Sequence, residues 1–231
     1  FLRLCALGLL LRGGWQEDKK VIDGVVDLLD RVSRFVSDPV SRQPVERIGA
    51  GLPQIRREAM SDGYCFLPDA YMLRVFAYCP SLLNSGRMRE QLKKAFDYVM
   101  SETYQKIGQE IDEETGELQS MHWGQLGVVR TVRGTVPREW GLQIPPIEHY
   151  LEQGNLDELL YLLELFARLG LVNRYPRLMS FMDWLLGQQE KDGRWDLPGK
   201  YFGHKPLYSS WLRLEKDWKS PNRRVADVTF R

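Results

Sequence analysis

Cysteine and histidine are both scarce in this chain, which contains three of each in 231 residues. The cysteines are Cys5, Cys65 and Cys79. They are too few and too widely spaced for a disulfide framework, and no Cys-x-x-Cys pair provides the spacing of a zinc site. We therefore expect a protein of the reducing cytoplasm that carries no metal and no cofactor.

Net charge and long apolar runs are lacking as well. The 32 basic side chains nearly balance the 31 acidic ones, so charge gives no argument for binding nucleic acid. The longest apolar run, residues 1–11, is interrupted by Arg3 and is shorter than the roughly 20 residues that span a bilayer, so we predict no transmembrane segment. It also lacks the basic leader and cleavage site of a signal peptide. Because Phe1 opens the chain inside a predicted helix, we expect the later part of a longer protein.

Helical periodicity is present along nearly the whole chain. Apolar residues recur every three to four positions in several segments, which predicts amphipathic helices. These segments are 18–36, 86–104 and 174–189. Shorter stretches are apolar nearly all round, and we expect them to be buried on every side. They are 1–11, 70–78, 156–169 and 207–214. Strand-like patterning is confined to 128–136, which predicts a short ribbon.

The helices recur as a repeated hairpin. Each copy has an apolar helix end, a link rich in Gly, Pro or Asn, and an amphipathic helix, and the copies begin near Ala6, Val75 and Leu165. A second echo pairs DGYCFLP at 62–68 with DGRWDLP at 192–198. Self-similarity of this kind marks units that bury their faces by stacking on their neighbours. We therefore predict an all-α fold in one domain over residues 1–231, with buried inner helices and amphipathic outer helices.

Residues 105–154 interrupt this rhythm and predict a long excursion between hairpins. Segments of this length without regular patterning are often functional, and we consider this one a candidate lid. Its acidic run at 110–114 offers carboxylate oxygens of the kind that Mg²⁺ prefers. Because the run continues into Thr-Gly-Glu, we interpret it as a solvated turn and predict no metal site.

A motif follows the third hairpin. The segment WLLGQQEKDGRW places Trp184, Gln189, Gly193 and Trp195 at a spacing that resembles the QW repeat of the terpenoid cyclase and protein prenyltransferase superfamily. The resemblance implies an α/α toroid, here a partial ring. It also implies a structural role, in which the glutamine bonds backbone groups at a helix end, the glycine allows a turn and the tryptophan packs on the next unit. The basic-small pair expected before Trp184 is missing, and Cys65 stands where the earlier copy should have tryptophan.

Catalytic signatures of that superfamily are missing. No Asp-rich DxDD run occurs, and His122, His149 and His204 are isolated from other zinc ligands. We interpret Cys65 as a thiol that lines the core, since no partner for a nucleophile can be located. The sequence therefore leaves open whether the chain is an enzyme.

Aromatic residues gather near the expected entrances of the inner helices. With His204 they form the candidate cavity lining: Tyr64, Phe66, Tyr71, Tyr201, His204, Tyr208 and Trp211. Aromatic walls suit an apolar chain, and their π faces stabilise carbocations. Plain core packing is the alternative interpretation of these aromatics, and a hydrogen-bonded loop position is the alternative for His204.

Several functions remain open. The leading hypothesis is a terpenoid cyclase-like or prenyltransferase-like protein whose central cavity takes an isoprenoid or another apolar small molecule. The second is a non-catalytic scaffold that binds a protein partner. The third is a carbohydrate-active toroid, with Asp69 and Asp196 as the facing carboxylates. A surplus of basic residues in 200–231 suits a phosphate group or, equally, a solvated helix end.

Overall fold

The computed structural model describes most of the chain. The described residues are 2–38, 44–45, 54–55, 68, 70–105, 109–111, 118–121, 127–131, 134–139, 142, 144–202 and 225. They are mostly helical, as the sequence predicts, and they fall into two compact units. Unit 1 is Phe1–Ile144 and unit 2 is Pro145–Arg231. The closure of both units into one toroidal domain stays a prediction.

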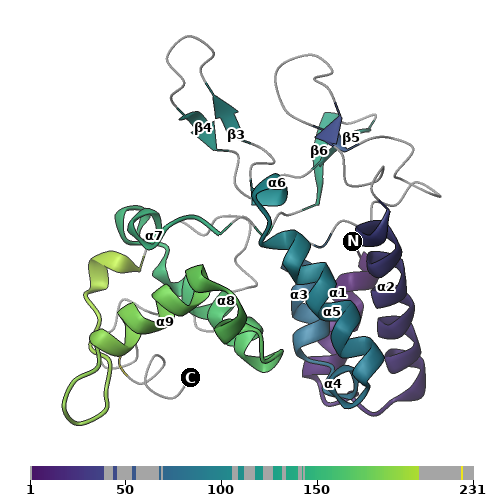
Figure 1. The fold of residues 1–231 in the computed structure, drawn as a ribbon, viewed down its shortest axis with the longest axis horizontal. Helices are drawn as coiled ribbons and strands as arrows, with labels where there is room; N and C mark the ends of the chain where they lie inside the picture. The colour runs from purple at the N-terminus through teal and green to yellow at the C-terminus, as the bar shows by residue number, and fades with distance from the viewer. Residues whose placement is uncertain are drawn as a thin grey trace. The chain divides into compact units, whose positions relative to one another are not determined.

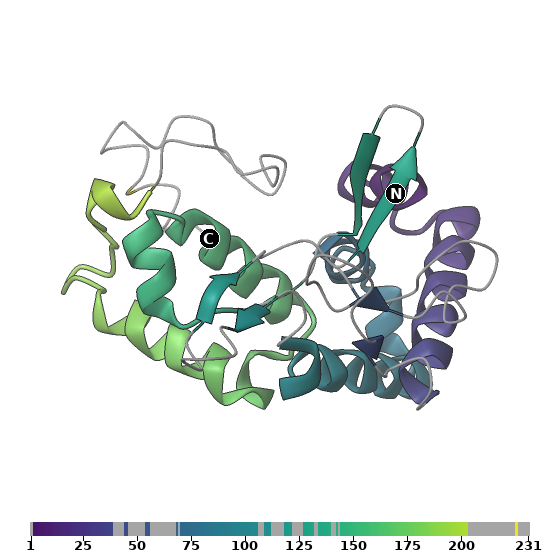
Figure 2. The ribbon, with the colours of Figure 1, turned by 90° about the horizontal axis from the view of Figure 1, so that it is seen from above.

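Unit 1 is built from two stacked helical hairpins. Its helices are α1 (Leu2–Arg12), α2 (Lys19–Ser37), α3 (Ala70–Ala77), α4 (Ser81–Asn84), α5 (Gly86–Val99) and α6 (Glu102–Gln105). Helix α1 packs against both α2 and α3, and α2 packs against α5, so the first helices of the two hairpins are neighbours and so are the long amphipathic helices (Figures 1 and 2). The two hairpins therefore stack side by side, and the assignment of α1 and α3 to an inner layer and of α2 and α5 to an outer layer stays a prediction.

Helix α2 follows the predicted amphipathic pattern closely. It begins after Asp18, whose carboxylate accepts hydrogen bonds from the backbone N–H groups of Lys20 and Val21. Such an N-cap satisfies two donors that the helix itself leaves unpaired. The buried face consists of Val21, Val25, Leu28, Leu29, Val32, Phe35 and Val36. Phe35 meets Tyr98 of α5 edge to face at 6.1 Å, which joins the two outer helices.

The two inner helices differ in how completely they are covered. All eight residues of α3 are buried, as the apolar pattern of 70–78 predicts. Helix α1 buries Leu7 and Leu11, but Leu9 is 61% exposed and Leu10 is 38% exposed. The prediction that residues 1–11 are buried on every side is therefore wrong for this structure. The stack covers the face of α1 that meets α2 and α3 and leaves the opposite face uncovered.

Helix α6 holds the two ends of the excursion together. Its Gln105 side chain donates to the carbonyls of Val99 and Leu142 at 2.7 and 3.0 Å and accepts from the N–H of Ile144 at 2.8 Å. The Tyr104 hydroxyl donates to the carbonyl of Pro68 and accepts from the N–H of Leu142. These bonds are buried. The excursion therefore returns to the helix from which it departs.

Short two-stranded antiparallel ribbons complete unit 1. They pair β1 (Pro44–Val45) with β2 (Gln54–Ile55), β3 (Gln109–Ile111) with β4 (Leu118–Met121), and β5 (Gly127–Thr131) with β6 (Gly134–Glu139). The last pair confirms the ribbon predicted at 128–136. The other two carry no alternating apolar signal in the sequence, so the pattern did not reveal them.

Unit 2 contains the third hairpin. Its elements are α7 (Ile147–Gln153), α8 (Leu156–Arg168), the 3-10 turn η3 (Val172–Arg174), α9 (Pro176–Gly187) and the 3-10 turn η4 (Gly199–Tyr201). Helix α8 ends at Arg168, and Gly170 just beyond it has a φ of 67°, which allows the N–H of Leu171 to reach the carbonyl of Phe166. This is the left-handed glycine that commonly ends a helix. Tyr150 and Phe181 meet edge to face at 6.1 Å and join α7 to α9.

In the part of the chain that the structure describes, none of the helices combines the length and the apolar character needed to cross a bilayer.

Candidate functional site

The structure describes six of the eleven residues of the candidate cavity lining and the motif. Tyr71 lies buried in α3 of unit 1, and Tyr201 lies half-buried in η4 of unit 2. The four residues of the motif, Trp184, Gln189, Gly193 and Trp195, lie in or just after α9. The others fall outside the described residues: Tyr64, Phe66, His204, Tyr208 and Trp211. Cys65 and Asp69 also fall outside them, and Asp196 is exposed.

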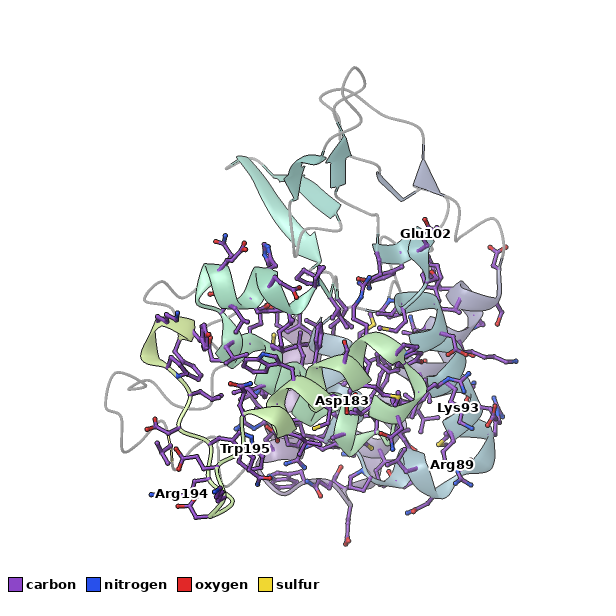
Figure 3. The ribbon with its side chains drawn as sticks, turned by 60° about the vertical axis from the view of Figure 1, so that its left-hand side comes forward. Arg89, Lys93, Glu102, Asp183, Arg194 and Trp195 are labelled. Atoms are coloured by element: carbon purple, nitrogen blue, oxygen red, sulfur yellow. The ribbon has the colours of Figure 1, made fainter. Side chains whose placement is uncertain are left out.

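The motif closes the loop that follows α9 (Figure 3). The indole N–H of Trp195 donates to the carbonyl of Leu185 at 2.7 Å, so the tryptophan satisfies a carbonyl at the helix end. The Gln189 amide donates to the carbonyl of Gly193 at 2.9 Å, within the loop itself. Gly193 has a φ of 86°, which favours glycine. The motif residues thus bond backbone groups around one turn, with Trp195 at the helix end.

Charged side chains on the same loop are exposed. Arg194 pairs with Asp192 at 2.6 Å, and this hydrogen bond lowers the pKa of the Asp192 carboxyl. Trp184 meets Tyr201 edge to face at 6.3 Å, which ties α9 to η4. These contacts order the loop, and they present no buried group that is poised for chemistry.

A buried polar side chain that could bind a ligand lies in unit 1. Arg74 of α3 is 5% exposed, and among the described residues its Nε–H has no hydrogen-bond partner. Tyr71 stands one turn before it and Tyr78 one turn after it, and both are buried. Residues three and four positions apart share a helix face, so α3 and the residue that follows it present a Tyr–Arg–Tyr face.

Helix α1 lies against this face of α3. A Cβ atom placed on Gly8 would lie 3.6 Å from the Nε atom of Arg74 and 3.8 Å from its Cδ atom. Four residues further on, the guanidinium of Arg12 lies over the ring of Tyr78, 5.5 Å from the centroid. Gly8 and Arg12 therefore flank the Tyr–Arg–Tyr face from the neighbouring inner helix. We call these five residues the Arg74 cluster.

A buried N–H donor without an acceptor is energetically unfavourable, and the Nε–H of Arg74 is such a donor. An unsatisfied buried donor costs about 1–3 kcal/mol. The carboxyl end of α3 lies within one turn of Arg74 and offsets part of this cost, because helix C-termini carry partial negative charge. The cluster therefore places one unsatisfied donor beside two buried aromatic rings.

Sequence reasoning found Tyr71 but missed Arg74. The available signal was that Arg74 is the one charged residue in the apolar stretch 70–79. Charged residues are almost never fully buried unless they are paired, so a lone arginine in such a stretch marks either a hidden partner or a ligand. The position of Gly8 beside it follows only from the packing of α1 on α3.

Titratable groups in unit 2 show smaller perturbations. Partial burial lowers the pKa of His149, against a smaller opposing effect from Glu152. Full burial raises the pKa of Tyr150 well above its usual value, and Glu158 acts in the same direction. Within the described ranges no group of three or more His, Cys, Asp or Glu side chains is arranged to hold a metal ion.

Comparison with protein-family models, with curated proteins and with solved structures gives no match to this chain.

Proposed function

We propose that this chain binds an isoprenoid-like or lipid-like molecule along its inner helices, as part of an α/α toroid of the terpenoid cyclase and prenyltransferase kind. The observation that carries the proposal is the buried side chain of Arg74 between Tyr71 and Tyr78, whose Nε–H has no hydrogen-bond partner. No residue is assigned a catalytic step, so the proposed activity is ligand binding.

The composition of the Arg74 cluster favours an amphiphilic ligand. Ligand sites in proteins are mostly apolar, with a few placed polar groups that fix orientation. Here the aromatic rings of Tyr71 and Tyr78 supply apolar surface, and Arg74 supplies one strong charged donor. A neutral hydrocarbon would leave the guanidinium unpaired, and a small inorganic anion would make no use of the aromatic rings. A molecule with an apolar chain and an anionic head group satisfies both.

A thermal-shift experiment tests the proposal. Farnesyl diphosphate and palmitate are titrated separately into the wild-type chain and into Arg74→Met, which keeps an unbranched apolar side chain and removes the charged guanidinium. We expect at least one of the two amphiphiles to raise the melting temperature of the wild type, and we expect Arg74→Met to weaken its binding at least tenfold. A ligand at about one hundred times its Kd stabilises a protein by about 2.7 kcal/mol, which such an assay detects readily.

Arg89→Met is the matched control, because Arg89 lies exposed on α5 (Figure 3). It should leave ligand binding unchanged. If neither amphiphile stabilises the wild type, or if Arg74→Met binds as well as the wild type does, the proposal is wrong.

A second candidate function is a scaffold for a protein partner. The observation that favours it is the uncovered apolar surface at the end of α1, where Leu9, Leu10 and the following Trp15 are exposed. Exposed apolar patches on soluble domains often mark interaction sites. A stoichiometric protein that copurifies with the wild type and is lost from a Leu9→Lys/Leu10→Lys variant would support the scaffold. Retention of that protein by the variant would count against this surface.

A further inference from the structure

We infer that the bond between Asp192 and Gly193 is a site of spontaneous backbone isomerisation, and that Arg194 slows this reaction in the folded protein. The inference goes beyond ligand binding and does not depend on it. In the reaction, the backbone nitrogen of Gly193 attacks the side-chain carboxyl carbon of Asp192. A C–N bond forms, and the carboxyl hydroxyl leaves with the N–H proton as water. Water then opens the succinimide ring at one of its two carbonyls, and one product is an isoaspartyl bond.

The chain contains three Asp-Gly pairs, and their surroundings differ. Glycine favours the reaction because it has no side chain to obstruct the attack. The pair at 23–24 lies inside α2, where the helix bonds hold the backbone N–H groups. The pair at 62–63 falls outside the described residues. The pair at 192–193 lies in the loop after α9, beside the labelled Arg194 (Figure 3). Of the two described pairs, it is therefore the one that no helix protects.

Arg194 holds the carboxylate that has to react. Its Nε and Nη2 atoms lie 2.7 and 2.6 Å from Oδ2 of Asp192, and its backbone N–H donates to Oδ1 at 3.2 Å. These bonds favour the ionised carboxylate, and they lower its pKa. The attack requires the neutral carboxyl, because a hydroxyl group leaves far more readily than an oxide. Arg194 therefore keeps Asp192 in its unreactive form.

The attacking nitrogen is held as well. The N–H of Gly193 donates to the carbonyl of Glu190 at 2.9 Å, and the carbonyl of Gly193 accepts from the Gln189 amide at 2.9 Å. The nitrogen of a succinimide ring carries no hydrogen, so the reaction must break the bond to Glu190. Both reacting groups are thus engaged in hydrogen bonds within one turn.

Isomerisation at this position has a structural consequence. An isoaspartyl bond inserts the Cβ atom of Asp192 into the backbone and so lengthens the turn that Gln189 and Gly193 close. Trp195 follows two residues later and donates its indole N–H to the carbonyl of Leu185 at 2.7 Å. A longer turn cannot keep all of these bonds in place. The reaction would therefore loosen the attachment of the motif to the end of α9.

The experiment follows the reaction in the whole chain by peptide mapping and mass spectrometry during several weeks at neutral pH. Aspartyl and isoaspartyl peptides have equal masses and separate by chromatography. The proteins are the wild type, Arg194→Met and Lys191→Met, and a synthetic peptide of residues 188–198 is the unfolded reference. Lys191 is the matched control, because it is exposed in the same loop and carries the same charge. Asp192→Glu should abolish the isomer, because glutamate would have to close a larger ring.

We expect the wild type to isomerise at Asp192 about threefold or more slowly than the peptide, and Arg194→Met to react about threefold or more faster than the wild type. Lys191→Met should react at the wild-type rate. Because Arg194 is exposed, its variant should keep the wild-type urea midpoint.

Three outcomes would overturn the inference. A wild type that reacts as fast as the peptide shows that the folded turn gives no protection. A wild-type rate in Arg194→Met, or an equal acceleration in Lys191→Met, removes the role of Arg194. More isomer at Asp23 than at Asp192 in the same digest contradicts the assignment of the site. None of these results bears on ligand binding, so the proposed function is tested separately.

Discussion

Replacing Gln105 with leucine should destabilise unit 1 far more than its place at the edge of a long excursion suggests. Leucine has a similar volume and no polar atoms, so the change removes hydrogen bonds while filling the same space. The wild-type side chain is 8% exposed and makes three hydrogen bonds, with the backbone of Val99, Leu142 and Ile144. In the variant, the carbonyl of Leu142 and the N–H of Ile144 lose their partner on α6.

The magnitude follows from the cost of unsatisfied groups. A buried donor or acceptor left without a partner costs about 1–3 kcal/mol, so the two groups at 142 and 144 together cost about 2–6 kcal/mol. Leucine recovers a part of this because its own burial is favourable. We therefore expect the free energy of unfolding to fall by about 3 kcal/mol, a large share of the 5–15 kcal/mol that typical domains possess.

Urea denaturation and amide hydrogen exchange measure this effect. Exchange should accelerate most at Ile144 and along α5 and α6, which localises the loss to unit 1. Gln91→Leu is the control, since Gln91 is half-buried and makes a hydrogen bond to Asp30 at 2.8 Å. It should cost less than about 1 kcal/mol. Equal losses in the two variants, or unchanged exchange at Ile144, would refute the reasoning.

Two further predictions concern unit 2. Burial lowers the pKa of His149 below 6.5, so the unfolded state binds a proton more readily, and stability should be full above about pH 6.5 and decline as the pH falls through that value. His149→Gln should flatten this decline between about pH 7.5 and pH 5.5 in urea denaturation, and an unchanged decline would contradict the assignment. Trp195→Phe removes the indole bond to the carbonyl of Leu185 and keeps most of the ring, so it should lower the free energy of unfolding by about 1 kcal/mol. The change in the urea midpoint measures it, and a variant as stable as the wild type would show that water replaces the bond.

The spacing of apolar residues predicted the amphipathic helices well, because each of them has one buried face and one exposed face. The segment predicted at 18–36 is the helix Lys19–Ser37, and the one predicted at 174–189 contains the helix Pro176–Gly187. A half-buried helix shows its orientation as a pattern of apolar and polar residues. The pattern predicted at 86–104 is divided, since α5 ends at Val99 and α6 begins at Glu102. Ser101 bonds both the carbonyl of Tyr98 and the N–H of Tyr104 there, a local competition that apolar spacing does not reveal.

The mostly apolar helices were predicted less well, because an apolar run does not show which of its faces is covered. The prediction of complete burial is correct for 70–78 and wrong for 1–11, since only the neighbouring elements decide whether Leu9 is covered. The Arg74 cluster could likewise be predicted only in part. Tyr71 could be proposed from its position at the start of an apolar stretch, but the contact of Gly8 with Arg74 joins residues of different hairpins and depends on how α1 docks on α3.

Two buried polar side chains, Arg74 and Gln105, stand out among the described residues, and they support opposite conclusions. The side-chain amide of Gln105 makes three hydrogen bonds to backbone groups, so its removal should destabilise the fold. The role of Gln105 is therefore structural. The Nε–H of Arg74 meets no acceptor in the described part of the chain, so replacing Arg74 with methionine should stabilise the unliganded fold, because it removes an unsatisfied buried donor. A residue that opposes folding is not explained by the fold that contains it. If Arg74→Met raises the urea midpoint while Gln105→Leu lowers it, the two burials have different origins, and Arg74 is retained for what it binds.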